Sequence, residues 1–451
     1  MLTNAAILLL GHAGTAACLL ARNLAVAALI PAEDYGVAVS FAMAMALVEM
    51  GTQIGVPSQI VRCSRGEDPR WIAAVHGFEI CRGILAALAL FLAAGPIAAF
   101  LGAADAAWAF RALAIAPLLR GFQHVDIHRQ TRESRHGPVI LVGLWPAGLA
   151  LAAVFPLAMW LGDWRIMVIS LVLQEVVALA TSHLLSRRPY RIGFDTAAWS
   201  GLMRFGWPIL LQGIVLFAAF HGDKILVARS LGLETLGVFA MGMTLTLTPA
   251  LILARSVQSG FLPLLTRAPD RAVAAATVEA GIVGAAGLAA VAAFALGPVV
   301  LPILGAGFAP LAELLALLGV QQALRVFRSG ATTVALGAGR AKVSLCADAV
   351  RAIGLAPIAI ILWQGGGLYE IVLVGTAFEA FACLVAFVGI RDRVPPSACL
   401  PAGLAGAATC VGIWTGAGPV VVSVCVVATV CLARNLRRIA RAPGTARSVP
   451  T

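Results

Sequence analysis

Residues 22–38 read RNLAVAALIPAEDYGVA, and residues 223–239 read DKILVARSLGLETLGVF. The first segment opens a longer stretch, Arg22–Arg62, in which one apolar run ends, a short acidic turn follows, and a complete second run begins. The second segment repeats the first 201 positions later without a gap: Val26, Ala27, Glu33, Gly36 and Val37 recur as Val227, Ala228, Glu234, Gly237 and Val238. A repeat of this length indicates a chain built from two like halves.

Composition identifies the solvent around most of the chain. Hydrophobic residues make up 61% of the 451 residues, charged residues make up only 12%, and mean hydropathy is +0.95. A soluble protein of this length could not bury so much apolar surface, so we expect a polytopic membrane protein. The net charge of +11 is spread as arginines between apolar runs, which argues for membrane topology and against a nucleic-acid partner.

The apolar runs predict an all-α fold with fourteen transmembrane spans, because a helix that crosses ~30 Å of hydrocarbon needs roughly 20 apolar residues. The first twelve spans form two pseudo-symmetric six-helix bundles, residues 1–190 and 191–395, and residues 396–451 add two shorter helices and a basic tail. The spans are expected near residues 6–30, 36–61, 71–101, 107–127, 137–160, 164–186, 205–231, 236–263, 272–302, 308–330, 341–363, 368–390, 399–415 and 418–433.

Basic residues collect on one side of this topology. The loops after the even-numbered spans and the C-terminal tail each carry two to five arginines or lysines, whereas the loops on the opposite side carry only Arg165. Because basic loops stay in the cytoplasm, the pattern predicts a multi-pass protein of the bacterial inner membrane with both termini cytoplasmic. The opposite loops are all short, which argues against an enzyme that acts on an external glycan.

The repeated segments also resemble those of a known family. Arg22-Asn23-Leu24 through Pro31-Ala32-Glu33-Asp34-Tyr35-Gly36 is similar to the opening of the polysaccharide-transporter (Wzx-like) branch of the multidrug/oligosaccharidyl-lipid/polysaccharide exporter superfamily. The second half opens similarly, with Phe205-Gly206-Trp207-Pro208 before span seven and Leu231-Gly232-Leu233-Glu234-Thr235-Leu236-Gly237 after it. In span count and half-boundary the resemblance covers nearly the whole chain, and it implies a flippase for lipid-linked oligosaccharides that works by alternating access.

Arg22 is the first candidate for a substrate site. It lies inside span one, about eight residues or ~12 Å from the outer end, where a charge costs at least ~2.5–3.5 kcal/mol on insertion scales. Two interpretations stay open. The guanidinium lines a central cavity and binds the diphosphate or acidic sugars of a substrate, or it forms a structural ion pair, for instance with Glu49 on span two.

Arg255 and Lys224 complete the predicted anion site. Related flippases place cavity arginines on their first, second and eighth spans, so the resemblance implies a cavity role for Arg22 and for Arg255 on span eight. A snorkelling position near the cytoplasmic interface is the alternative for Arg255. Lys224 lies on span seven beside Asp223, and a helix points two adjacent side chains about 100° apart.

The sequence contains no Walker motif, so we expect an H+ or Na+ gradient, and no bound cofactor, to drive transport. Asp223, Glu49 and Glu379 are the candidate ion-coupling residues, because intramembrane carboxylates are the usual proton-linked groups. Asp223 has a second interpretation, in which it neutralises Arg22 or Arg229. His124 and His128 have a metal-compatible spacing, but they lie at a helix end among arginines, and we predict no metal site.

These observations predict a flippase that translocates a polyprenyl-diphosphate-linked oligosaccharide across the inner membrane for O-antigen or exopolysaccharide biosynthesis. Its candidate protein partners are a polysaccharide polymerase and a glycosyltransferase. A cation-coupled multidrug exporter and a lipid II flippase of the same fold are the alternatives, although an exporter of cationic drugs calls for cavity carboxylates where span one offers Arg22. A polytopic glycan polymerase or ligase is opposed by the short loops and by the repeat.

Overall fold

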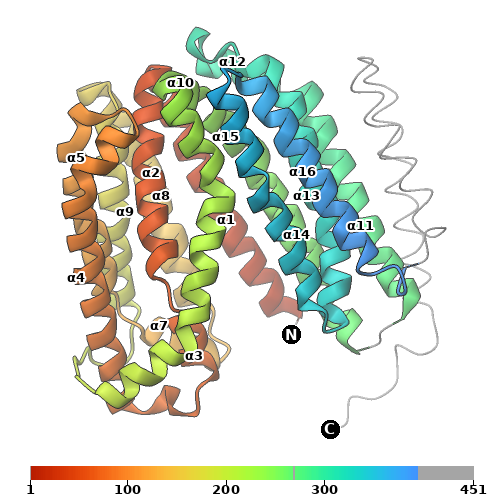
Figure 1. The fold of residues 1–451 in the computed structure, drawn as a ribbon. Helices are drawn as coiled ribbons and strands as arrows, with labels where there is room; N and C mark the ends of the chain where they lie inside the picture. Colours follow the sequence, from red (N-terminus) through yellow and green to blue (C-terminus); the bar gives the residue numbers. More distant parts are fainter. Residues whose placement is uncertain (1, 268–269, 395–451) are drawn as a thin grey trace. The chain divides into compact units, whose positions relative to one another are not determined.

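The computed structural model describes residues 2–267 and 270–394, and every regular element in these ranges is a helix (Figure 1). The predicted all-α fold is therefore confirmed. Packing divides the described chain into a first unit that ends at Met241 and a second that begins at Gly242. The domain boundary expected near residue 190 follows the sequence repeat and stays a prediction. The region expected at residues 396–451, with spans thirteen and fourteen, lies outside the described residues.

The first unit consists of ten α-helices joined by short connections. Pro31 begins α2, and the Asp68 side chain caps α4 by accepting the backbone N–H of Arg70 at 2.9 Å, so the apolar runs are divided at the turn residues. The elements are α1 (Leu2–Leu29), α2 (Ala32–Thr52), α3 (Val56–Arg62), η1 (Ser64–Glu67), α4 (Pro69–Phe100), η2 (Ala104–Ala106), α5 (Ala107–Leu113), α6 (Ile115–Gly121), α7 (Asp126–Arg132), α8 (Gly137–Leu161), α9 (Arg165–Leu184) and the first part of α10 (Thr196–Arg267).

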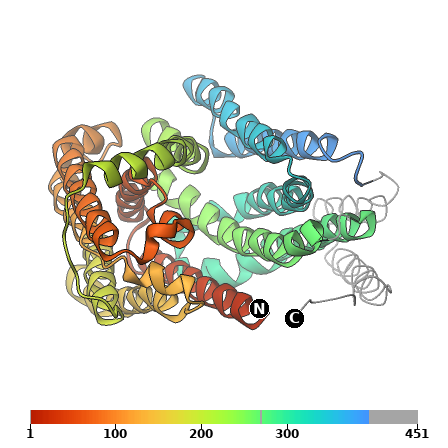
Figure 2. The same ribbon diagram turned by 90° about the horizontal axis from the view of Figure 1, so that it is seen from below.

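Two groups of helices position the polar residues of the first unit. Helix α8 packs against α1 and α9, and α4 packs against α5 and α6. In Figure 1 the helices α2, α4 and α9 run in roughly the same direction, and α2 contacts both of the others, so they form a bundle, which Figure 2 shows from below. Helices α6 and α9 also touch, which joins the two groups. Side chains on α1, α6 and α9 can therefore meet inside this bundle.

The repeated turn motifs pack against each other within the first unit. Gly36 in α2 lies so close to the backbone of Leu233 that a Cβ would overlap it, and Gly237 is equally close to the backbone of Ala32. The chain bends between them at Gly232, whose φ of 86° interrupts α10. A positive φ of this kind favours glycine, so α10 is two helices joined at a kink. The glycines that the repeat conserves between its two copies are thus contact points.

In the described residues, the second unit contains the rest of α10 and six further α-helices. Helix α13 lies at its centre and packs against both α11 and α16, and the core between them is built from small and branched apolar residues such as Val278, Ala331 and Ala382. The elements are α11 (Arg271–Val291), the π-helical turn η3 (Ala292–Leu296), α12 (Gly297–Leu304), η4 (Ala306–Phe308), α13 (Leu311–Gly337), α14 (Ala341–Ile353), α15 (Leu355–Trp363) and α16 (Leu368–Val388).

Each of the twelve spans expected before residue 394 corresponds to a helix or to a broken pair of helices. In the described ranges, nine helices are long and apolar enough to cross a membrane, with α10 counted once. Two of these twelve spans are not among the nine helices. The span at 107–127 is broken into α5 and α6, which have seven residues each, and α13 carries Arg325 and Arg328. The total of fourteen spans stays a prediction.

Candidate functional site

Arg22 is held inside the first unit by neutral amides. Its side chain projects from α1, the residue is only 5% exposed, and its Nη1 donates to Gln174 Oε1 of α9 at 2.7 Å. Its Nη2 makes a longer contact of 3.5 Å with Asn23 Oδ1. Within the described residues Arg22 forms no ion pair, and its Nε has no hydrogen-bond partner. The structure thus shows a buried cation without a carboxylate beside it, and the ion pair with Glu49, named under the second interpretation, does not form.

Glu49 instead belongs to a cluster around Arg120 on α6. Arg120 Nη1 lies 2.8 Å from Glu49 Oε2, and its Nη2 contacts Glu175 Oε1 of α9. Gln123 also donates to Glu175, at 3.3 Å. The Glu175 side chain is buried, whereas the Glu49 side chain is 52% exposed. One guanidinium therefore pairs with two carboxylates, of which only Glu49 is accessible.

A polar cavity of about 140 Å³ adjoins this cluster in the first unit. Arg82 contributes to its wall and is anchored by Glu79, 2.5 Å away, and by Thr52 Oγ1, 3.0 Å away. The polar side chains of the lining are Gln53, Glu79, Arg82, Arg120, Gln123, His124 and His128. The cavity is suited to water and small polar groups and is too small for a sugar chain.

His124 is engaged by backbone groups at both ring nitrogens. Its Nε2 lies 2.9 Å from the carbonyl of Arg188, and its Nδ1 accepts the N–H of Asp126 at 3.1 Å. The described residues contain no group of three or more His, Cys, Asp or Glu side chains placed to hold a metal ion. His124 thus ties the segment after α9 to the turn before α7.

Glu379 lies at the centre of a second charge cluster, in the second unit. It is 1% exposed on α16 and contacts Arg351 Nε at 2.7 Å, Arg328 Nε at 3.0 Å and Arg325 Nη2 at 3.5 Å. Arg328 also pairs with Asp348, at 2.8 Å. Three guanidinium groups around one carboxylate anchor α13, α14 and α16 to one another, which is a structural role.

The two clusters repeat one arrangement that no single sequence motif reveals. In each unit a carboxylate near the middle of a late helix, Glu175 of α9 or Glu379 of α16, pairs with arginine from an earlier helix, Arg120 of α6 or Arg325 of α13. The two pairs are offset by 204 and 205 positions, close to the repeat of 201. These pairs could have been found in the sequence by extending the comparison of the two halves beyond the opening motif.

The remaining candidates are placed as follows. Lys224 is 9% exposed on α10, and its Nζ lies 3.5 Å from the carbonyl oxygen of Phe220. Asp223 is partly buried and accepts the backbone N–H of Lys224 at 2.8 Å; in the part of the chain described it forms no ion pair with Arg22 or Arg229. Arg255, in the second unit, is exposed and has no ion pair among the described residues. In the described part of the first unit, the side-chain hydrogen bonds of Arg22 go to Gln174 and Asn23 and not to Lys224.

Comparison with known proteins decides the family. Residues 25–304, more than half of the chain, match the family described as "Polysaccharide biosynthesis protein". The chain belongs to this polysaccharide biosynthesis family. This match confirms the resemblance drawn from the repeated turn motifs.

One curated relative of this family member agrees with that assignment. The succinoglycan biosynthesis transport protein ExoT of Rhizobium meliloti (strain 1021) is 23% identical over 239 residues, which are 52% of this chain and 48% of that protein. The match thus spans about half of the relative's length.

Solved structures show the same fold. The lipid II flippase MurJ in an inward closed conformation has a TM-score of 0.71 at 12% identity, covering 96% of this chain and 99% of that one. An inward-facing MATE family multidrug transporter of the MOP superfamily has a TM-score of 0.67 at 16% identity, covering 84% and 94%. At these identities the likeness concerns the fold alone.

Proposed function

We propose that this polysaccharide biosynthesis family member is a flippase that moves a polyprenyl-diphosphate-linked oligosaccharide across the bacterial inner membrane by alternating access. The product would serve O-antigen or exopolysaccharide synthesis. Support comes from the family match, from the succinoglycan transport protein as a relative, and from the fold that the chain shares with a lipid II flippase. Both termini are proposed to be cytoplasmic, as the distribution of arginines favours.

The burial of Arg22 among amide groups is the main support for the proposed substrate class. A buried guanidinium satisfied only by amide oxygens retains its full charge, and desolvation makes such a charge expensive until an anion is beside it. The diphosphate of a lipid-linked sugar supplies that anion, with oxygen atoms that match the donor fork of arginine. A cationic drug would be repelled at the same place. Lys224 and Arg255 are proposed to add to this site.

Glu49 is the coupling candidate that the geometry favours. It shares Arg120 with Glu175, so Glu49 can take up a proton while Arg120 keeps its bond to Glu175. Its side chain is also the accessible one of the pair. Asp223 stays a second candidate, whereas Glu379 is enclosed by three arginines that stabilise its charged form. The driving ion is proposed to be H+ or Na+.

Polysaccharide export tests this proposal. A strain that lacks the protein is complemented with wild type, Arg22→Ala, Arg255→Ala or, as a control, Arg111→Ala, whose side chain is exposed on α5. We expect export to be restored by wild type and Arg111→Ala and to be reduced by both other variants. Full export with Arg22→Ala and Arg255→Ala, at equal protein levels, would remove the cavity-arginine mechanism. A polymerase or glycosyltransferase partner would be sought by crosslinking in the same strain.

A further inference from the structure

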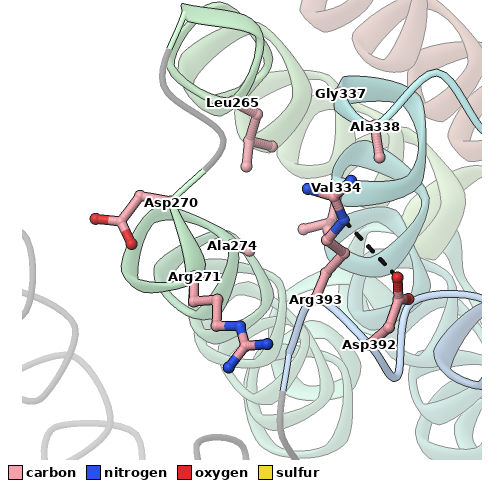
Figure 3. A pocket seen from close by; sticks show the side chains of 9 residues that line it. All are labelled: Leu265, Asp270, Arg271, Ala274, Val334, Gly337, Ala338, Asp392 and Arg393. Carbon is pink, nitrogen blue, oxygen red and sulfur yellow. Dashed lines mark ion pairs between the residues drawn. The ribbon is translucent and has the colours of Figure 1, made fainter.

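A pocket of about 290 Å³ lies in the second unit, and none of the candidate transport residues lines it (Figure 3). It forms where α10 ends, α11 begins, α13 ends and the chain leaves α16. Its floor is apolar and its rim is charged. The floor consists of Leu265, Ala274, Val334, Gly337 and Ala338, and the rim consists of Asp270, Arg271, Asp392 and Arg393.

The floor is part of the packed core, so the pocket is preformed. Leu265 is 4% exposed and Val334 is 2% exposed, and both belong to the core cluster of α10, α11, α13 and α16. Gly337 allows α13 to approach α10 closely, because a Cβ at this position would lie 2.7 Å from the Leu265 Cβ. Ala338 beside it is small and only partly buried. An occupant would therefore lie on apolar side chains that are already in place.

Both acids of the rim are already engaged. Arg340 binds the Asp392 carboxylate with two hydrogen bonds, of 2.7 and 2.8 Å, while Arg393 Nε stands 3.9 Å from it. Asp270 caps α11 by accepting the backbone N–H two residues further on, at 3.1 Å. In Figure 3 its carboxylate points away from the other labelled side chains.

Arg271 and Arg393 supply the charge that is left for a ligand. Arg271 is exposed and forms no ion pair in the part of the chain that is described, and Arg393 is the second cation on a carboxylate that Arg340 already neutralises. With Arg340 counted, three guanidinium groups lie at this end of the unit against the two carboxylates of the rim, so the local charge is positive and favours an anion. A phosphate group fits two guanidinium groups better than a carboxylate does, because its oxygens can accept from both at once.

The depth of the pocket points to a lipid. One candidate span ends at Thr266 and the next begins at Arg271, so the rim lies at the level where a membrane helix leaves the hydrocarbon. This is also the arginine-rich side, which the positive-inside rule assigns to the cytoplasm, and anionic lipids attract basic pockets there. A phospholipid carries a phosphate for the rim and an apolar chain for the floor, whereas inorganic phosphate leaves the floor empty.

We infer that this pocket binds the phosphate of an anionic membrane phospholipid, with Arg271 and Arg393 on the phosphate and the start of an acyl chain on Leu265, Val334 and Ala338. The inference does not depend on the proposed transport site. It adds a lipid-binding site through which membrane composition acts on the second unit.

Native mass spectrometry of the full-length protein in detergent tests this inference. The probes are phosphatidylglycerol, phosphatidylcholine with the same acyl chains, and inorganic phosphate. We expect phosphatidylglycerol to bind best, and the double variant Arg271→Gln/Arg393→Gln to weaken it roughly 30-fold, from about 1 kcal/mol for each arginine near a membrane surface. Ala338→Leu should also weaken binding, because it fills the floor without changing charge.

The matched control is Arg65→Gln/Arg70→Gln, which removes the same charge from exposed residues of the arginine-rich loops in the first unit. It should leave phosphatidylglycerol binding unchanged. Equal weakening by the control would assign the effect to general surface charge and overturn the site. Equal binding of inorganic phosphate would make the ligand a soluble anion, and unchanged binding in both pocket variants would place the lipid elsewhere.

Discussion

Arg22 Nη1 of α1 lies 2.7 Å from Gln174 Oε1 of α9, so a buried guanidinium donates to an amide while the next residue of α9, Glu175, pairs with Arg120. Adjacent residues of a helix point about 100° apart, so α9 sends its amide to one arginine and its carboxylate to another. This division leaves the charge of Arg22 uncompensated by protein carboxylates in the described ranges. The proposed function rests on that charge.

Arg22→Gln and Arg22→Lys separate charge from geometry at this site. If the site binds a diphosphate, Arg22→Gln should weaken substrate binding by ~30-fold or more, since losing a buried charged hydrogen bond costs about 2–5 kcal/mol. Arg22→Lys should retain part of the affinity, because it keeps the charge and loses the fork of donors. The measurement is binding of a polyprenyl diphosphate to purified protein. Equal affinity in all three proteins would contradict the assignment.

The buried ion pairs are expected to be structural. Glu175→Gln removes the buried one of the two carboxylates that pair with Arg120, and Glu379→Gln removes the carboxylate that three arginines share. Breaking a buried pair from one side costs about 3–5 kcal/mol. We expect lower melting temperatures for both. Glu313→Gln, at an exposed position at the start of α13, is the control and should melt like wild type. A melting temperature unchanged in Glu379→Gln would show that the three arginines do not depend on Glu379.

Glu49→Gln tests coupling. If Glu49 takes up the coupling proton, this variant should transport at a rate that no longer varies with the pH gradient across proteoliposomes, while binding of the diphosphate persists. Glu33→Gln, outside the Arg120 cluster at the start of α2, is the control. Transport by Glu49→Gln with an unaltered response to the gradient would move the coupling role to Asp223.

The close contact between the two turn motifs predicts that a larger side chain at Gly36 destabilises the protein. Gly36→Leu would force side-chain atoms into the backbone of Leu233 and should destabilise the protein by at least ~1–3 kcal/mol, the usual cost of overpacking. Gly51 lies in the same helix with open space around it. Gly51→Ala should therefore be neutral or stabilising, by up to ~1 kcal/mol. Thermal unfolding in detergent compares the two, and equal melting temperatures would refute the close contact.

His128 of α7, at the arginine-rich end, should make the free energy of unfolding decrease as the pH is lowered. Burial lowers the pKa of His128, near the start of α7, to about 4. The unfolded chain binds this proton near pH 6.5, so the stabilisation is present above pH 6.5 and is lost as pH falls from there toward 4. We expect a loss of roughly 1–2 kcal/mol by pH 5.

His128→Gln provides the matched measurement for this effect. Its melting temperature should fall less between pH 7.5 and pH 5 than that of wild type, because one titrating group has been removed. His12→Gln, at an exposed position of α1, should fall as much as wild type does. The pKa assignment is wrong if His128→Gln and wild type lose equal stability over this range.

Most of the fold could be predicted because lipid imposes a simple rule on the sequence. Runs of about 20 apolar residues become helices, and Pro31 or Asp68 with Pro69 mark where helices begin. The breaks inside spans could not be predicted. Gly55 adopts a left-handed conformation that separates α2 from α3, yet glycine also occurs inside intact helices such as α4, so its identity alone decides nothing.

The sequence predicts how deep the candidate side chains lie in the membrane, but it does not predict which partners they meet. Position along a span indicates that Arg22 is buried, but its partner depends on how α1 and α9 lie against each other, which no local pattern states. Glu49, the example of an ion-pair partner for Arg22 in one of the two interpretations, pairs with Arg120 instead. Arg120 sits on the short helix α6, where a basic residue in the last turn is an ordinary feature of a helix end.

The most direct test of the central claim is the distribution of the lipid-linked glycan between the two leaflets of the inner membrane, measured in cells with and without this protein. The account predicts that the glycan accumulates on the cytoplasmic face when the protein is absent, and that wild type restores its outer-leaflet exposure while Arg22→Ala does not. A normal leaflet distribution in cells that lack the protein, together with altered sensitivity to cationic drugs, would contradict the flippase and favour an exporter.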